Sequence, residues 1–288
     1  MIKLLALDLD GTLLNSSGQI PTANKHAIKL AENVGVLVTI ATGRRFRDAL
    51  PIALQLDLNA PVVCHNGALL KFAETLETVH ASIIPTETVF EIIRVGKQFG
   101  GDALVSCDPH TKGTLFYDRI SDDNVPLKRY VEWSKRLHGD DAEDAVHHVA
   151  KLEEIVADEQ VIHISFSGTC EPMSKLQLIL EAELGKSVSI LATIYPHLDF
   201  TLLDVLPQNS TKATGLQKLA EIHNLTAENV MAIGDNFNDL DMLQYAKTPV
   251  VMGNASASLL ANENFYTTLS NDENGVAAAI GKFILGEN

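Results

Sequence analysis

Short apolar runs alternate with amphipathic segments along the first part of the chain. Residues 2–9 form a largely apolar run, the pattern of a strand that is buried on both faces. Further strands are predicted for residues 36–41 and 61–64, and helices for residues 22–34 and 45–56. Strands that alternate with helices at these spacings predict an α/β fold with a doubly wound, Rossmann-like parallel sheet.

The same alternation returns near the C-terminus. Helices are predicted for residues 211–222, 240–246 and 275–284, and strands for residues 230–233 and 250–252. Because both ends of the chain show one pattern, we expect them to form a single α/β core.

The middle of the chain interrupts this pattern. Residues 84–206 contain an amphipathic helix, several short strand-like runs and a polar, charged stretch, which together predict an α+β domain. We therefore expect a core of residues 1–83 and 207–288, with residues 84–206 inserted into it.

Composition narrows the functional classes. The chain has 288 residues, of which 22 are basic and 37 are acidic, giving a net charge of −15. Such a surface repels nucleic acid and anionic membranes, and a phosphorylated ligand would need local positive charge. The three cysteines form no CxxC pair and are too few and too scattered for a disulfide framework. No signal peptide or membrane-spanning run is evident, so the expected location is the cytoplasm.

The most informative motif lies at the end of the first predicted strand. Asp8 and Asp10 lie two residues apart, so both side chains can face one site, and Gly11 permits a sharp turn beside them. Ligand sites in open α/β sheets lie beyond the carboxyl ends of the strands, where these residues fall. An ordinary polar turn at the end of a strand is the alternative.

A second acidic motif follows the strand predicted for residues 230–233. Asp235 is the candidate for a direct metal ligand, because magnesium prefers carboxylate oxygens. Asn238 and Asp239 precede a predicted helix and are also typical N-cap residues. We expect Asp239 both to cap that helix and to lie beside the metal ligands.

Two further sequence features are weak indicators of a phosphate site when each is taken alone. Thr42-Gly43-Arg44 follows the second predicted strand and offers a hydroxyl and backbone N–H groups to a phosphate, although a capped helix start is an equal alternative. Lys212 opens a predicted helix, where an isolated lysine is usually solvated. All of these features fall on one edge of the predicted sheet, and together they supply what phosphoryl transfer requires.

Four motifs occur in order: DLDGTLL at residues 8–14, ATGR at residues 41–44, Lys212, and GDNFNDLDML at residues 234–243. The chain thereby resembles the haloacid dehalogenase-like superfamily, in its Cof-type branch of sugar-phosphate and related phosphatases. HNGA, VVMGNA and NGVAAAI match further features of that branch, so the resemblance covers nearly the whole chain. The inserted domain resembles the α/β cap of the C2B type that sets substrate specificity in this branch.

The resemblance implies a magnesium-dependent phosphatase that acts on a phosphorylated small molecule. Asp8 would form an aspartyl phosphate, and Asp10 would serve as acid and then as base. Asp8, the backbone carbonyl of Asp10, and Asp235 would hold Mg²⁺, while Lys212 and Thr42 would stabilise the phosphoryl group. The remaining expected residues are Gly11, Gly43, Arg44 and Asn66 around the phosphate, and Asn238 and Asp239, which orient the metal ligands or Lys212.

Several alternatives stay open at this point. A sugar phosphomutase would use the same motifs, and a non-catalytic protein that senses phosphate or metal would need the same pocket. Hexose phosphates are the first expectation for the substrate, with nucleotide-derived, flavin and pyridoxal phosphates as rivals. The sequence does not indicate the oligomeric state.

Overall fold

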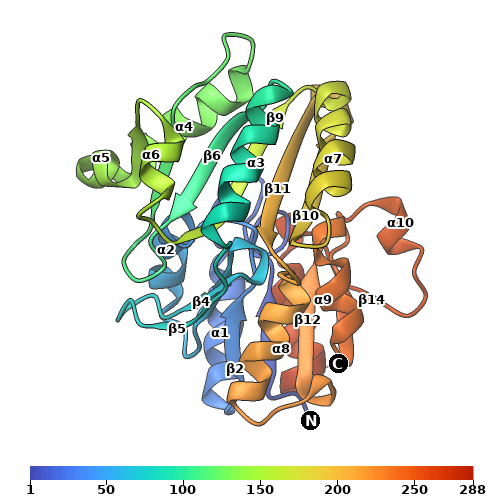
Figure 1. Cartoon of the computed structure of the whole chain (residues 1–288). Helices are drawn as coiled ribbons and strands as arrows, with labels where there is room; N and C mark the ends of the chain where they lie inside the picture. Colours follow the sequence, from blue (N-terminus) through green and yellow to red (C-terminus); the bar gives the residue numbers. More distant parts are fainter. Residues whose placement is uncertain (288) are drawn as a thin grey trace. The chain divides into compact units, whose positions relative to one another are not determined.

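The computed structural model describes residues 1–287, with only the backbone for His197. The chain forms two units. The core unit comprises Met1–Arg44, Leu50–Thr75 and the chain from Thr211 onward, and the inserted unit comprises Arg45–Ala49 and Leu76–Ser210. In Figure 1 the blue and orange-to-red ends of the chain belong to the core unit, and the green and yellow middle belongs to the inserted unit.

A five-stranded parallel sheet forms the centre of the core unit, in the order β14-β13-β12-β1-β2. Its strands are β1 (Leu4–Leu7), β2 (Leu37–Ile40), β12 (Val230–Gly234), β13 (Thr248–Val251) and β14 (Tyr266–Thr267). All four residues of β1 are buried, as its continuous apolar run predicts. The predicted doubly wound parallel sheet is confirmed.

The third predicted strand joins this sheet only weakly. β3 (Val62–Cys64) is linked to it by a single parallel bridge between Ala41 and Val63. It otherwise pairs antiparallel with β4 (Leu69–Lys71). The short helical turn η1 (His65–Gly67) reverses the chain between them, and Gly67 adopts a φ of +90° there.

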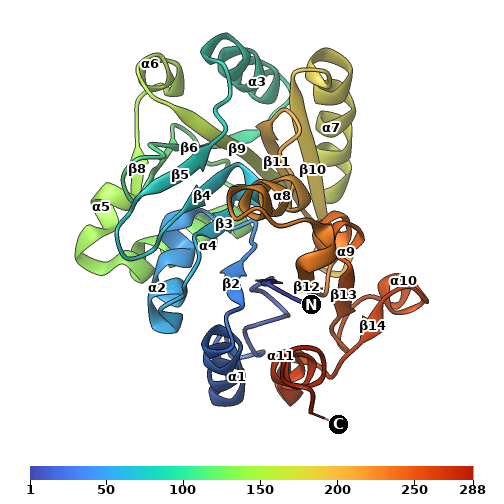
Figure 2. The ribbon, with the colours of Figure 1, turned by 90° about the horizontal axis from the view of Figure 1, so that it is seen from below.

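Helices cover both faces of the core sheet. Figure 2 shows α1 and α11 together on one side of it and α8 and α9 together on the other. The predicted closing helix is divided, because α11 ends at Ile280 and a π-helical turn, η7 (Gly281–Leu285), follows. The helices and helical turns in or entering this unit are α1 (Thr22–Asn33), α2 (Phe46–Leu56), α8 (Lys212–Ile222), η4 (Ala227–Asn229), η5 (Phe237–Asp239), α9 (Leu240–Tyr245), α10 (Ala257–Leu260), η6 (Asn271–Glu273) and α11 (Gly275–Ile280).

The inserted unit contains a six-stranded sheet in the order β10-β11-β9-β6-β7-β8. Its neighbouring strands are antiparallel except for β7 and β8, so it is an α+β unit as predicted. The strands of the unit are β5 (Thr78–Ala81), β6 (Asp102–Cys107), β7 (Thr114–Tyr117), β8 (Val146–His148), β9 (Val161–Gly168), β10 (Val188–Tyr195) and β11 (Phe200–Pro207). Its helices and helical turns are α3 (Thr86–Gln98), α4 (Val125–His138), η2 (Gly139–Asp141), α5 (Ala142–Ala145), α6 (Leu152–Val156), α7 (Cys170–Leu184) and η3 (Pro196–Leu198).

Two apolar clusters hold this sheet. Helices α3 and α7, side by side in Figure 1, pack on one face through residues such as Ile92 and Leu176, which belong to the same apolar cluster as Phe166 of β9. Helix α4 packs on the other face through Leu127 and Val131. The strand residues alternate between the two faces, which is the period that a sheet covered on both sides requires. None of the helices described in residues 1–287 combines the length and apolar character that crossing a membrane requires.

A buried ionic network lies within the inserted unit. Arg45 donates two hydrogen bonds to Asp48, at 2.8 and 2.9 Å, and one to Ser134 at 2.8 Å. Tyr130 and His138 contact the same carboxylate, both at 2.9 Å. Burial alone would raise the pKa of Asp48, but the Arg45 guanidinium and these hydrogen bonds hold it well below the ordinary value. The network therefore ties Arg45–Ala49 to helix α4 through a carboxylate that stays ionised.

We predict that Asp48→Asn lowers the free energy of unfolding of the inserted unit by about 3 kcal/mol at pH 7, because Arg45 then stays buried without an anion. The pKa of Asp48 is depressed in the folded state, so its contribution is present above its unfolded pKa and is lost as the pH falls. The difference between variant and parent should shrink below about pH 4.

Urea unfolding at pH 7 and at a series of lower pH values measures this difference. Asp122→Asn is the matched control, since the Asp122 side chain is fully exposed and should change stability little at any pH. A loss of stability in Asp48→Asn that is the same at pH 7 and pH 3 would contradict the assignment.

Candidate active site

Asp8, Lys212 and Asp239 form a buried ion-pair chain in the core unit. The Lys212 ammonium donates to Asp8 Oδ1 at 2.6 Å and to Asp239 Oδ1 at 2.6 Å. Asp8 follows β1, Lys212 opens α8, and Asp239 ends the turn η5. The side chain of Lys212 is 0 % exposed, so the alternative interpretation of a solvated surface lysine is wrong.

The start of α8 is positioned by close backbone packing. Thr211 caps the helix through a reciprocal pair of hydrogen bonds with Thr214. Gly67 lies against the Thr211 carbonyl and has no room for a Cβ, and the backbone of Gly215 packs against it from the next turn of α8. The HNGA motif therefore places η1 directly on the helical turn that carries Lys212.

The turn after β12 presents the second acidic group. One oxygen of Asp239 accepts hydrogen bonds from the backbone N–H groups of Asp235 and Asn236, both at 3.0 Å, while the other contacts Lys212. Asp239 thus completes the capping box of η5, whereas its side chain makes no capping hydrogen bond to α9, the helix that it was expected to cap. Asn238 lies in the same turn and is half-buried.

Asp235 is held by the first motif. The Thr12 hydroxyl donates to Asp235 Oδ1 at 3.0 Å, a contact that the sequence interpretation missed although Thr12 is part of DLDGTLL. Gly11 has a φ of +83°, and a Cβ at this position would collide with the Asp235 carboxylate. Asn254, from the VVMGNA motif, donates to the Gly11 carbonyl at 2.9 Å and so holds the turn from its other side.

Three carboxylates in this region could hold a metal ion. Oxygen atoms of Asp8, Asp235 and Asp239 all lie within 4.8 Å of one another. Burial raises the pKa of Asp235 to about 6, and the nearby Asp239 charge adds to this. Burial and the Asp239 charge likewise raise the pKa of Asp8, against the effect of Lys212. One ammonium cannot balance three carboxylates, so the donor set fits a hard divalent cation.

The loop that was predicted to bind phosphate, Thr42-Gly43-Arg44, follows the end of β2. The Thr42 hydroxyl accepts a hydrogen bond from the Arg44 N–H at 3.1 Å, and the Asn66 N–H donates to the Thr42 carbonyl at 3.1 Å. A Cβ on Gly43 would lie 3.0 Å from Asn66 Oδ1, so the absence of a side chain lets Asn66 approach. The structure therefore brings Thr42, Gly43 and Asn66 together.

Arg44 has a different contact from the one expected. Its guanidinium forms a bidentate pair with Asp10, at 2.8 Å from Nε and 2.5 Å from the second nitrogen. The Asp10 side chain is 61 % exposed, so it differs in environment from buried Asp8. The expected contact of the Asp10 backbone carbonyl with a metal stays a prediction.

Phosphoryl transfer requires a positioned nucleophile and groups that stabilise charge, and the buried carboxylates, the ammonium and the hydroxyl are groups of these kinds. Because they lie at the carboxyl ends of parallel strands, they define a phosphoryl-transfer enzyme of the α/β class. A family model described as haloacid dehalogenase-like hydrolase matches residues 5–280. The chain belongs to this family, and the resemblance noted in its motifs is confirmed.

Curated relatives of the chain are phosphatases. It is 29% identical, over 99% of both chains, to a 5-amino-6-(5-phospho-D-ribitylamino)uracil phosphatase, YwtE, of Bacillus subtilis. It is 27% identical to the pyridoxal phosphate phosphatase YbhA of Escherichia coli, over 91% of this chain and 92% of that one. A solved haloacid dehalogenase-like hydrolase from Bacteroides thetaiotaomicron is 26% identical, with a TM-score of 0.79 over 99% of this chain and 100% of that one. The chain is a phosphatase.

We predict that Gly11→Ala lowers turnover by about tenfold or more, because the new Cβ displaces the Asp235 carboxylate. Gly18→Ala is the matched control, since Gly18 also has a positive φ (+71°) but no atom lies within 4 Å of its Cβ position. Both variants should lose similar stability through backbone strain, about 1 kcal/mol. Steady-state rates and thermal unfolding measure the two effects, and equal rates in both variants would contradict the role of Gly11.

Proposed function

We propose that the chain is a magnesium-dependent phosphatase that hydrolyses a small-molecule phosphomonoester through an aspartyl phosphate on Asp8. The observation that carries this proposal is the buried cluster in which the Lys212 ammonium joins Asp8 to Asp239 beside Asp235. A structural ion pair would need one carboxylate for one lysine, whereas this cluster keeps a large excess of negative charge out of water.

The chemistry proceeds in two transfers. A carboxylate oxygen of Asp8 attacks phosphorus, the bond from phosphorus to the ester oxygen breaks, and Asp10 gives a proton to the departing alkoxide. Water then attacks the phosphorus of the acyl phosphate and loses a proton to Asp10. Inorganic phosphate leaves, and the Asp8 carboxylate is restored.

The other residues bind and orient the phosphoryl group. Asp8, the Asp10 carbonyl and Asp235 would hold Mg²⁺, which when bound offsets the repulsion between the Asp8 carboxylate and the phosphate. Lys212 and the Thr42 hydroxyl stabilise charge on the phosphoryl oxygens. Gly11, Gly43 and Asn66 keep the backbone close enough for N–H groups to contribute, and Asn238 supports the turn at Asp239.

The Arg44–Asp10 pair suggests how binding and acid catalysis are connected. Arg44 holds both oxygens of Asp10, and an arginine is equally suited to a phosphate. The phosphate of an arriving substrate competes for this guanidinium. Asp10 is then released to carry the proton that the leaving group needs.

The substrate is a phosphorylated small molecule, with sugar phosphates as the first candidates. The relatives named above act on a phosphoribityl compound and on pyridoxal phosphate, so both belong beside hexose phosphates in any test. We assign the choice among them to the inserted unit, in agreement with its resemblance to a cap.

We predict that Asp8→Asn abolishes turnover while thermal unfolding stays cooperative, because an amide oxygen is a poor nucleophile. Asp57→Asn, at an exposed aspartate of the same unit, should retain the parent rate. Phosphate release measures the rate, and acid quenching with labelled substrate should trap phosphoprotein only when Asp8 is present. Turnover near the parent value in Asp8→Asn would refute the nucleophile assignment.

We also predict that Asp235→Asn raises the magnesium concentration needed for half-maximal rate about tenfold or more, because one carboxylate ligand is lost. Magnesium should raise the melting temperature of the parent protein and should do so less in the variant. Superimposable titrations for the two proteins would exclude Asp235 as a metal ligand.

A panel of phosphorylated metabolites tests the reaction class. Free phosphate from a hexose phosphate indicates hydrolysis, whereas an isomeric sugar phosphate indicates a mutase. If the protein releases phosphate from p-nitrophenyl phosphate and this release stops when the metal is chelated, the result supports a metal-dependent phosphatase. Binding of phosphate without any turnover would favour the sensing protein instead.

A further inference from the structure

Two asparagine side chains of the core unit hold the turn that follows Asp10. The Asn254 amide donates to the Gly11 carbonyl at 2.9 Å. The Asn271 amide donates to the Leu14 carbonyl, also at 2.9 Å. The two side chains are connected as well, because the Asn254 side-chain oxygen accepts from the Asn271 backbone N–H at 2.9 Å. They therefore form one support for both ends of the turn.

Close backbone packing brings the two asparagines together. The Gly253 N–H donates to the Leu269 carbonyl at 3.0 Å, and a Cβ on Gly253 would lie 3.0 Å from the Ser270 nitrogen. Asn254 and Asn271 are the next residues along these two segments. The glycine therefore allows the approach that joins the VVMGNA motif to the segment before α11.

These contacts fix the backbone that carries the Asp10 carboxylate. Gly11 follows Asp10 directly, and an isolated parallel β-bridge pairs Asp10 with Leu14. The carboxylate itself is 61 % exposed and is held by Arg44. When the substrate phosphate takes this guanidinium, as proposed above, the direction of the carboxylate depends on the backbone beneath it. The hydrogen bond from Asn254 to Gly11 holds this backbone one residue away from Asp10.

The position of Asn254 at the surface favours such a role over a structural one. The residue is exposed, yet both polar atoms of its side chain are hydrogen-bonded to backbone groups. Hydrogen bonds of this kind contribute little to folding, because the same groups bind water in the unfolded chain. Replacing Asn254 is therefore expected to change the stability of the core unit only slightly.

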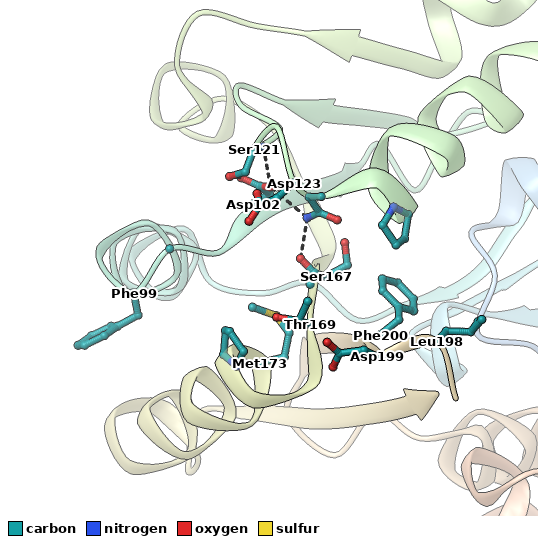
Figure 3. A pocket seen from close by; sticks show the side chains of 15 residues that line it. Phe99, Asp102, Ser121, Asp123, Ser167, Thr169, Met173, Leu198, Asp199 and Phe200 are labelled. Carbon is teal, nitrogen blue, oxygen red and sulfur yellow. Dashed lines mark hydrogen bonds between the residues drawn. The ribbon is translucent and has the colours of Figure 1, made fainter. Parts of the chain in front are cut away.

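An asparagine of the inserted unit shows the contrasting, structural case. Figure 3 shows Asp102 and Ser167 in the wall of a cavity of about 400 Å³ in that unit. The buried Asn124 amide donates to Asp102 at 3.0 Å and to the Ser167 carbonyl at 2.7 Å. Its oxygen caps α4, and Asp102 is also paired with Arg119 at 3.2 Å. Asn124 thus supports the fold of its unit, whereas Asn254 holds a turn on which the proposed chemistry depends.

We propose that Asn254 is a positioning residue that aims the Asp10 carboxylic acid at the ester oxygen of the leaving group. In the first transfer the bond from phosphorus to the ester oxygen breaks, and the proton of Asp10 moves to that oxygen. Asp10 is left as the carboxylate that later takes a proton from the attacking water. Asn254 forms none of these bonds and acts by holding the Gly11 carbonyl. This inference rests on the acid role of Asp10 in the proposed function.

Two phosphate esters of nearly equal size test the inference. The leaving oxygen of phenyl phosphate is basic and needs the proton, whereas that of p-nitrophenyl phosphate leaves easily without it. With enzyme in excess, release of the phenol measures the first transfer alone. Asn254→Ala should slow this release about tenfold for phenyl phosphate and less than about threefold for p-nitrophenyl phosphate. An equal change for the two esters, or no change for phenyl phosphate, would overturn the inference.

Asp10→Asn is the reference variant, because it removes the acid itself. It should show the same selective loss for phenyl phosphate, to a larger degree. If Asp10→Asn slows both esters equally, the acid role in the proposed function is wrong, and this inference fails with it. A selective loss in Asp10→Asn without one in Asn254→Ala leaves the acid role standing and overturns only the role of Asn254.

Asn229 provides a matched control at the opposite end of the strands. It precedes β12, where it donates to the Met1 carbonyl at 3.4 Å and accepts from the Thr226 N–H at 3.2 Å. Asn229→Ala therefore loses the same pair of contacts away from the turn at Asp10. It should change the melting temperature about as much as Asn254→Ala does, but it should release both phenols at the parent rate.

Asn254→Asp isolates the contact with Gly11. Its carboxylate can still accept from the Asn271 N–H but has no hydrogen to donate to the Gly11 carbonyl. The selective loss for phenyl phosphate should therefore appear in this variant as well. Release from both esters at the parent rate would show that the donated hydrogen bond does not position Asp10.

Discussion

The ammonium of Lys212 between Asp8 and Asp239 is the interaction on which the core site depends. It joins three segments that lie far apart in the chain: the end of β1, the first residue of α8 and the turn η5. A fully buried lysine is tolerated only when its charge is matched, and here the two nearby carboxylates raise its pKa despite burial. The same contacts that stabilise the lysine therefore fix the position of the proposed nucleophile.

The order of the parallel strands brings the other groups to this point. β1 lies between β12 and β2, with Leu7 in register with Ile233 and with Ile40. Asp8, Asp235 and Thr42 each follow those positions by one or two residues, so they emerge at the same edge of the sheet. The site follows from strand order and register, because parallel neighbours end together and their following loops meet.

Sequence patterns predict the strands and their terminal residues well, because a strand buried on both faces must be apolar throughout. These patterns do not predict which contacts the side chains make in the loops that follow the strands. The Arg44–Asp10 pair and the Thr12–Asp235 hydrogen bond depend on the turn at Gly11 and on packing between distant segments. The polar segment that contains β8 also lacked a clear pattern, because only one of its three residues is buried.

The candidate site of the core unit supplies local positive charge. The chain as a whole carries a net charge of −15, so a phosphorylated substrate requires local positive charge where it binds. In the core unit Lys212 and Arg44 supply that positive charge, and each is already paired with an aspartate that the proposed mechanism needs.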